Sequence, residues 1–470
     1  MSRPNRSNGG FSTHNQQSSK SFADHAAKEQ QAVSLINQGK LQEAEAIYED
    51  LIATGTRNHV VFANLAAVYL MQGSYTKSIP LLKKVIQLEP NDPDAHNNLS
   101  IALQEKGDLD AAIASYNTAL QLKPNDPKTH NNLGIALKEQ GDFNAAIASY
   151  NTALRLKPND PEIHFNLGIA FMGRGELDSA IDSYKEALQL KPNYTEAHNN
   201  LGIALHEKAD LIAAIASYDK ALELKPNDPD ANWNSSVARL LGGNYKKGWK
   251  QYEWRDKKQN SNSKPHAQPK CCMWDGSEID RNTDILLVSE QGLGDTLQFM
   301  RYAIALREQG ASVSICAQAK LNSLIRASGI DPSPLSQQEA NKIINGQWIP
   351  LLSVPRHLGV NPENPIITSP YIKTTDELID KWKGILSTQQ RPIVGINWQG
   401  NPSHEKTNSK GRSLPLETFA PIAHLTNASL LSLQKGFGSE QLETCSFKDR
   451  FVSCQDQVND TWDFLETAAI

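Results

Sequence analysis

Five prolines recur along the chain at a constant interval of 34 residues, and this period constrains the fold more than any other feature. Each opens a variant of the sequence Pro-Asn-Asp-Pro and precedes a near-copy of the same segment; the five are Pro90, Pro124, Pro158, Pro192 and Pro226. A repeat of this length is too short to bury a core alone, so it folds by stacking on its neighbours. The period therefore predicts an α-solenoid of helix pairs.

The unit that starts at Pro93 shows how a helix pair forms. Asp92 stands where an N-cap belongs, and proline suits the first helical position because its missing N–H would find no partner there. Gly107 and Asp108 break this helix, and a second helix is expected to bury Tyr116. Small residues at fixed places let neighbouring helices approach closely: Gly134, Gly168 and Gly202 in the first helices, and Ala112, Ala146, Ala180 and Ala214 in the second.

These residues resemble the tetratricopeptide repeat family, and the resemblance implies a superhelix that binds a protein or peptide partner. Weaker copies extend the pattern in both directions, and we expect about seven units over residues 23–257. In the last unit Ser235, Arg239 and Gly248 replace the residues that the repeat requires. Such degeneracy is typical of a cap whose outer face meets water or another domain.

Composition narrows the class of protein. A net charge of −5 and a pI near 6.2 give no reason to expect nucleic acid or an anionic membrane as partner, and no run of about 18 apolar residues predicts a membrane span. Residues 1–22 are rich in Ser, Asn and Gln and are expected to form a disordered tail without a secretion signal. The five cysteines have no metal-binding or disulfide spacing, which indicates a reducing, cytoplasmic setting and no metal site.

A polar set shares the period of the prolines. One asparagine occupies the same place in the first helix of six successive units: Asn64, Asn98, Asn132, Asn166, Asn200 and Asn234. On the inner face of a superhelix a carboxamide can hydrogen-bond an extended backbone, because it has an acceptor and two donors. Helices about 8–10 Å apart would meet about every third residue of a bound peptide. In this respect the array resembles the O-linked N-acetylglucosamine transferases, whose superhelix holds substrate peptides through an asparagine ladder.

The alternative is that duplication copied the asparagines without any function. Asn64 and Asn234 favour peptide contact, because they persist in units that have otherwise diverged. Four histidines repeat as well, and we expect them on a solvated face, since a shared metal ion would need them much closer than one repeat apart. These are His96, His130, His164 and His198.

The second half of the chain follows a different pattern. Residues 258–282 are rich in polar residues and proline and are expected to form a linker. An apolar run over 284–289 is typical of a buried parallel strand, and a glycine turn, a helix over 296–309 and a second strand over 311–316 follow. The same order of strand, turn, helix and strand begins again at Pro392. We predict two doubly wound α/β units, residues 283–390 and 391–470, with a ligand in the cleft between them.

Three segments of this half resemble the heptosyltransferase-like family of GT-B type glycosyltransferases. They are the turn that ends in Asp295, the run over 395–400 and the pair Arg412–Ser413. The resemblance implies sugar transfer from a nucleotide-sugar donor without an obligatory metal, with Asp295 as the base that deprotonates the acceptor hydroxyl. Loop cations would steady the donor diphosphate. The implied substrate contacts are Gly292, Gly294, Gln399 and Gly400, and the implied donor contacts are Lys406, Lys410 and Arg412. Asp295 could equally be an N-cap, and the cations a solvated loop.

The second α/β unit has about 80 residues, too few for a sheet of the usual size. We therefore expect an incomplete donor pocket, an exposed apolar sheet edge, and a sequence that is a fragment, the product of an interrupted gene or a relic. Two functions follow. One is a tetratricopeptide-guided glycosyltransferase, and the other is a non-catalytic interaction scaffold with a vestigial transferase domain. Whether the chain is an enzyme stays open between them.

Overall fold

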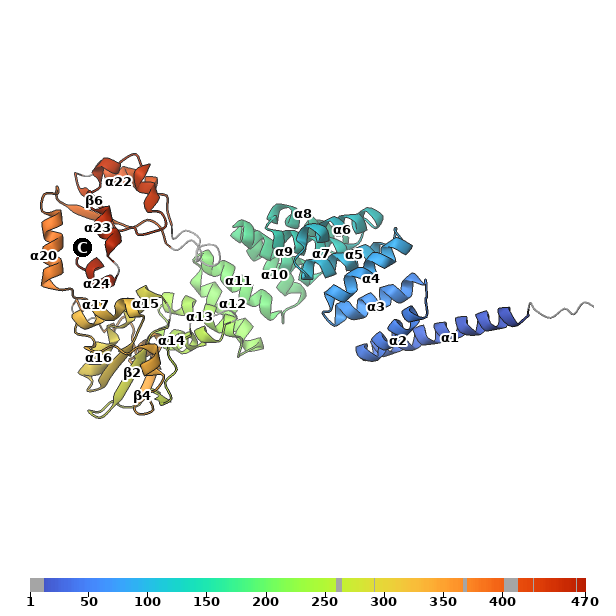
Figure 1. Cartoon of the computed structure of the whole chain (residues 1–470), viewed down its shortest axis with the longest axis horizontal. Coiled ribbons are helices and arrows are strands. Elements are labelled where there is room, and N and C mark those ends of the chain that lie inside the picture. The colour runs from blue at the N-terminus through green and yellow to red at the C-terminus, as the bar shows by residue number, and fades with distance from the viewer. Residues whose placement is uncertain are drawn as a thin grey trace, which may run out of the picture. The chain divides into compact units, whose positions relative to one another are not determined.

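The computed structural model describes residues 12–258, 264–290, 292–366, 370–400, 413–425, 427–461 and 463–470. They fall into two compact units, Met1–Ala238 and Arg239–Ile470. The first unit consists of helices, and the second carries two small parallel sheets together with helices (Figure 1).

The first unit is a stack of helix pairs in which each helix packs on the next along the chain (Figure 1). First helices of successive units also touch, α3 with α5, α5 with α7, α7 with α9 and α9 with α11, so they line one common face. The helices are α1 (Ser12–Asn37), α2 (Leu41–Ala53), α3 (His59–Met71), α4 (Tyr75–Leu88), α5 (Pro93–Glu105), α6 (Leu109–Leu122), α7 (Pro127–Gln140), α8 (Phe143–Leu156), α9 (Pro161–Arg174), α10 (Leu177–Leu190), α11 (Thr195–Glu207), α12 (Leu211–Leu224) and α13 (Pro229–Leu241).

The repeated residues explain why these helices form and pack. Asp160 caps α9 by accepting hydrogen bonds from two first-turn amides, and Pro161 takes the first helical position. Tyr184 of α10 is fully buried against α9, where a Cβ at Gly168 would stand 2.5 Å from its ring. Glycine at this place is therefore needed for the close approach of the two helices.

The amino-terminal tail is shorter than predicted, because α1 begins at Ser12 rather than after residue 22. Once the turns around Ala32 are packed on α2, each further residue adds a backbone hydrogen bond without a new nucleation cost. Polar residues can therefore extend the helix without burying anything.

The second unit contains a four-stranded parallel sheet in the order β1-β4-β2-β3. Its central strand β2 is buried at four of five positions, and Leu287 pairs with Ile315 of β3 and Ile349 of β4. Met300 and Arg301 split the expected helix over 296–309 in two. The elements are β1 (Cys272–Met273), β2 (Asp284–Val288), β3 (Ser312–Cys316), β4 (Gln347–Pro350), α14 (Tyr245–Tyr252), α15 (Leu293–Phe299), α16 (Tyr302–Glu308), α17 (Asn322–Ala327), α18 (Gln337–Ala340), α19 (Val354–His357) and α20 (Asp376–Leu386), with the 3₁₀ turns η1 (Glu253–Asp256), η2 (Ala319–Leu321) and η3 (Leu351–Ser353).

A second sheet pairs β5 (Ile393–Ile396) in parallel with β6 (Ser429–Ser432). We expected an exposed apolar edge here, but Phe451 bridges to Leu430 and the amide of Val452 donates to the Leu430 carbonyl at 2.8 Å. At the β6 edge the expectation was wrong, because the segment after β6 folds back over that strand. The remaining elements are α22 (Ala420–Leu425), α23 (Gln455–Asp460), α24 (Phe464–Thr467), η4 (Leu416–Phe419), η5 (Ser439–Glu443) and η6 (Lys448–Arg450).

Two predicted boundaries differ from the observed ones. The predicted linker contains β1 and the buried Trp274, because the polar residues around 258–270 conceal a short apolar segment that follows them. The last repeat helix, α14, belongs to the second compact unit, where the indole Nε1 of Trp249 donates to the Val360 carbonyl at 2.9 Å. Helix α14 therefore contacts the sheet-bearing unit through Trp249.

Candidate functional site

The predicted asparagine ladder lies on the first helices, where its members are half-buried and Asn166 is buried. Three of them donate an amide hydrogen bond to an asparagine of the preceding unit, which stands one residue before the ladder position. These bonds run from Asn132 Nδ2 to Asn97 Oδ1 (3.4 Å), from Asn166 Nδ2 to Asn131 Oδ1 (3.1 Å) and from Asn234 Nδ2 to Asn199 Oδ1 (3.1 Å). The ladder therefore joins neighbouring units, a role that the sequence did not suggest.

The bond to the preceding unit uses only part of the carboxamide of Asn132, Asn166 and Asn234. A primary amide has two N–H donors and an oxygen acceptor, and the bond to the preceding unit takes one donor. At Asn98 and Asn200 the accepting asparagine is replaced by Ala63 and Phe165. The ladder can thus stabilise the stack and still present hydrogen-bonding groups on the face that the first helices share.

An apolar row accompanies the ladder and was missed from the sequence. Three residues after the asparagine, which is on the same helix face, successive units carry a half-buried isoleucine. The row comprises Ile101, Ile135, Ile169 and Ile203. The 34-residue period would have revealed it, since its members repeat as regularly as the prolines. The face offers branched apolar side chains beside amides.

One unit breaks the pattern with an aromatic cluster. The ring of Phe165 lies 5.9 Å from that of Tyr184 and 4.9 Å from that of Tyr194, and Lys191 Nζ lies 4.1 Å from the Tyr194 centroid. Burial raises the pKa of Tyr194 to about 12. Tyr194 stands where other units place an N-cap aspartate, and it makes no capping bond to α11. A missing cap costs about 1 kcal/mol, and such broken local rules mark candidate functional positions.

The four repeated histidines have structural partners. Each Nε2 bonds the carbonyl oxygen of the repeat proline six residues earlier, at 3.1 Å for His96 and 2.9 Å for the other three. In the next unit Asn232 Nδ2 donates to the Pro226 carbonyl at 3.0 Å in the same way. The side chains therefore fix the turn between units. Across the described ranges no group of His, Cys, Asp or Glu is arranged to hold a metal ion.

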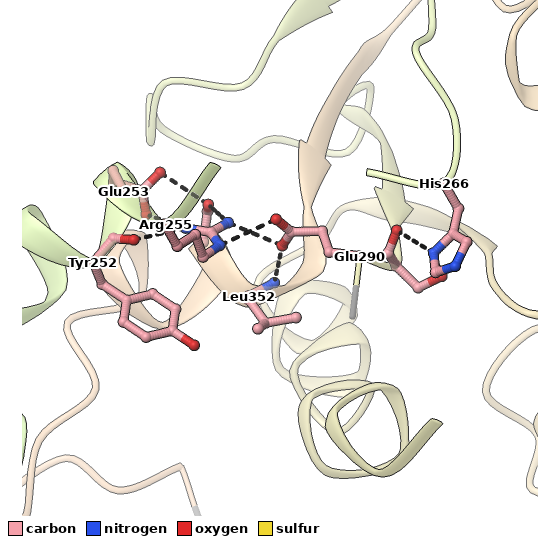
Figure 2. A network of polar contacts seen from close by, with 8 residues as sticks. Tyr252, Glu253, Arg255, His266, Glu290 and Leu352 are labelled. Carbon is pink, nitrogen blue, oxygen red and sulfur yellow. Dashed lines mark hydrogen bonds and ion pairs between the residues drawn. The ribbon is translucent and has the colours of Figure 1, made fainter. Parts of the chain in front are cut away.

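A buried ion pair joins η1 to the end of β2 (Figure 2). Arg255 donates through Nε and Nη2 to the two oxygens of Glu290, at 3.1 and 2.9 Å, and both residues are at most 4% exposed. The guanidinium also donates to Ser353 Oγ, and the Leu352 amide donates to Glu290. Desolvation raises the pKa of Glu290, although Arg255 opposes the shift. The pair occupies the carboxyl ends of β2 and β4, where ligands bind in many open α/β sheets.

Asp295, the predicted base, lies in the first turn of α15. Its Oδ2 accepts the Gly292 amide at 3.2 Å, so it closes the glycine turn as a cap. Its charge also acts on Tyr252: burial raises the pKa of that hydroxyl to about 12, with Arg255 opposing and Asp295 adding to the rise. Gly294 has open space around it.

The other implied transferase residues are engaged or not described. Gln399 Oε1 accepts from Gln441 at 3.0 Å, and its backbone is bonded on both sides by the buried Gln434. The Gly400 amide donates to Ser413 Oγ at 2.9 Å. Lys406, Lys410 and Arg412 lie outside the described residues. Among the described residues no hydrogen bond or ion pair joins Gln399 or Gly400 to Asp295.

None of the helices in the described ranges is long and apolar enough to cross a membrane. All five cysteines are free thiols.

Comparison with known proteins concerns the repeats. Residues 66–107, 102–141, 136–174 and 170–208 match the family described as TPR repeat, and residues 195–228 match the one described as tetratricopeptide repeat. The comparison with curated proteins gives no match.

Several solved structures are similar to this chain. MamA 41-end from Desulfovibrio magneticus RS-1 is 25% identical over 37% of this chain and 98% of that one, with a TM-score of 0.35. YrrB, described as a TPR protein with an unusual peptide-binding site, is 20% identical over 39% and 95%, with a TM-score of 0.34. The C-terminal part of a TPR repeat-containing protein from Cytophaga hutchinsonii is 19% identical over 49% and 96%, with a TM-score of 0.41. By the family matches, residues 66–228 of this chain are tetratricopeptide repeats.

Proposed function

We propose that the chain is a protein-interaction scaffold whose array binds an extended segment of a partner along its first helices. The observation that carries the proposal is the paired period of asparagine and isoleucine on one helix face. The amides suit a peptide backbone, and the isoleucines suit its apolar side chains. Because the two rows run through successive units, binding would depend on backbone and shape more than on one sequence.

The charge of the array and its aromatic cluster indicate which kind of partner segment it would bind. Residues 93–228 contain 19 acidic and 12 basic side chains, so the array attracts a basic segment. Phe165 and Tyr194 supply a rigid aromatic site at one rung, which suits an apolar anchor residue and would fix the register of the segment. We propose a basic partner segment with branched apolar side chains, and a reducing, cytoplasmic setting, which the five free thiols support.

The test begins with a random peptide library displayed on phage and selected on the purified full chain. A recovered peptide, labelled with a fluorophore, is then titrated by anisotropy. We expect enrichment of basic and branched apolar residues. Replacing Asn98, Asn132 and Asn166 with Ala in succession should weaken binding by about 2–10-fold per step, since a hydrogen bond contributes about 0.5–1.5 kcal/mol. Unchanged affinity in the triple variant would contradict the proposal.

A matched control separates binding from stability. Asn131→Ala removes the acceptor of the Asn166 bond while leaving the ladder residue in place. Both Asn131→Ala and Asn166→Ala loosen the contact between units, but only Asn166→Ala should lower peptide affinity. If the two variants weaken binding equally, the asparagines act only by holding the units together.

A second proposal is sugar transfer by the C-terminal unit. What supports it is the glycine turn after a central parallel strand, which Asp295 closes by accepting the Gly292 amide at 3.2 Å. Asp295→Asn keeps an oxygen for the Gly292 cap but cannot accept a proton, so it should abolish turnover of a nucleotide-sugar while leaving the fold intact. Asp280→Asn, on the same unit, is the matched control. Release of nucleotide from a panel of nucleotide-sugars is the readout, and no release by the unaltered chain would sink the proposal.

A further inference from the structure

A cavity of about 460 Å³ lies in the C-terminal unit between α14 and the segment that follows α19. Tyr245 and Trp249, four residues apart on one face of α14, form one wall. Gly359, Val360 and Asn361 form the other. The volume falls in the range of small-molecule sites, about 300–1,000 Å³.

The cavity is held open by bonds that do not depend on a ligand. Trp249 Nε1 donates to the Val360 carbonyl at 2.9 Å, and its ring packs edge-on against Tyr252 at 5.6 Å. Asn361 Oδ1 accepts the amides of Glu363 and Asn364, which fixes the opposite turn. These contacts pre-organise the two walls, so a ligand would not have to order them.

Three cations and no acidic side chain line the cavity. Lys246 and Lys250 stand four apart on α14, an arrangement in which like charges repel, and Arg356 projects from α19. All three are exposed, and in the part of the chain that the structure describes none forms an ion pair with a carboxylate. Burial and the charge of Arg356 lower the pKa of the neighbouring His357, and the charges of Glu253 and Asp275 oppose the shift. The site is therefore positive and lacks an internal counter-charge.

We propose that this cavity binds a nucleotide, with the base against the Tyr245 and Trp249 rings and the phosphates on Lys246, Lys250 and Arg356. Aromatic side chains are platforms for planar bases, and Lys and Arg bind phosphate oxygens through charge-assisted hydrogen bonds. An inorganic anion alone would leave the aromatic wall unused. Neither Asp295 nor any of the implied substrate contacts lines the cavity, so the proposal stands apart from peptide binding by the array and from the acceptor site of a transferase.

The test uses the full chain and isothermal titration with ATP, GTP and UTP, beside adenosine and inorganic tripolyphosphate. At least one nucleoside triphosphate should bind at micromolar concentration, more tightly than either part alone. Lys250→Gln and Arg356→Gln should each weaken binding about tenfold, or about 1.4 kcal/mol. Lys342→Gln, an equal charge change at an exposed residue outside the cavity, should have no effect.

A second variant separates the two halves of the site. Tyr245→Ala should weaken the nucleotide but not tripolyphosphate, whereas the two cation variants should weaken both. Failure of every nucleotide to bind with a Kd below about 1 mM, which corresponds to a binding free energy of about −4.1 kcal/mol, would overturn the proposal. So would equal weakening by Lys342→Gln, or equal affinity for the nucleotide and tripolyphosphate. Circular dichroism of each variant confirms that it folds.

Discussion

Removing the charge of Glu290 should destabilise the C-terminal unit strongly. Glu290→Gln keeps the volume but removes the buried counter-charge of the Arg255 guanidinium, which is 3% exposed, while the partly exposed Glu253, 3.3 Å from Nη1, remains. Breaking one side of a buried pair costs about 3–5 kcal/mol. With an m-value of about 2 kcal/mol/M in urea, a loss of about 4 kcal/mol moves the unfolding midpoint down by about 2 M. Adding Arg255→Met should recover part of the loss, because no buried charge remains.

The chain provides separate probes for its two units. Seven of its eight tryptophans follow residue 239, so tryptophan fluorescence follows the C-terminal unit, while circular dichroism at 222 nm is dominated by the helices of the array. Only the fluorescence transition should shift. Asp380→Asn, which breaks an ion pair with side chains 69% and 75% exposed, should leave both transitions unchanged. A shift for Glu290→Gln no larger than that of this control would refute the buried pair.

Three further predictions concern the array. Burial alone would raise the pKa of Asp160, but bonds from a lysine and from backbone amides outweigh burial and lower it. Asp160 therefore binds a proton less readily in the folded chain than in the unfolded chain. Its contribution to the unfolding free energy is present above about pH 4 and is lost as pH falls through the folded pKa. Asp160→Asn should therefore make the unfolding free energy, measured in urea, less dependent on pH in the acid range. Gly168→Ala should lower the unfolding free energy by about 1 kcal/mol through its clash with Tyr184, although alanine favours helices, and a stabilised array would contradict this packing. His130→Leu should cost about 1 kcal/mol by freeing the Pro124 carbonyl, and His130→Asn should restore most of it in thermal unfolding; equal losses would exclude the bond.

Much of the array can be predicted from its period. A repeat shows its helix, turn and packing residues several times over, so the close helix approach at Gly168 is predicted without a structure. The strands β2 and β3 lie inside the apolar runs that predicted them, and β5 begins directly after Pro392, where the second α/β unit was expected to start. In both cases the signal is local, since periodicity and apolar runs do not depend on distant residues.

The other features depend on contacts between residues far apart in the sequence, which no local pattern predicts. Arg255 pairs with Glu290 across 35 residues, and a carboxylate directly after a buried strand was the only sequence sign of that pair. The ladder bond from Asn166 reaches Asn131 across a similar interval, so a stabilising role became visible only in space. The polar residues before Cys272 concealed a strand of two residues, too short to give a pattern.

The most direct test of the proposed function is a crystal structure of the full chain with a selected peptide. We predict an extended peptide along α5, α7, α9 and α11, with its backbone about 3 Å from the carboxamides of Asn132 and Asn166 and an apolar side chain against Phe165. A peptide bound to the second helices of the units, or to the C-terminal unit, would contradict the proposal that the asparagine and isoleucine rows form the binding face.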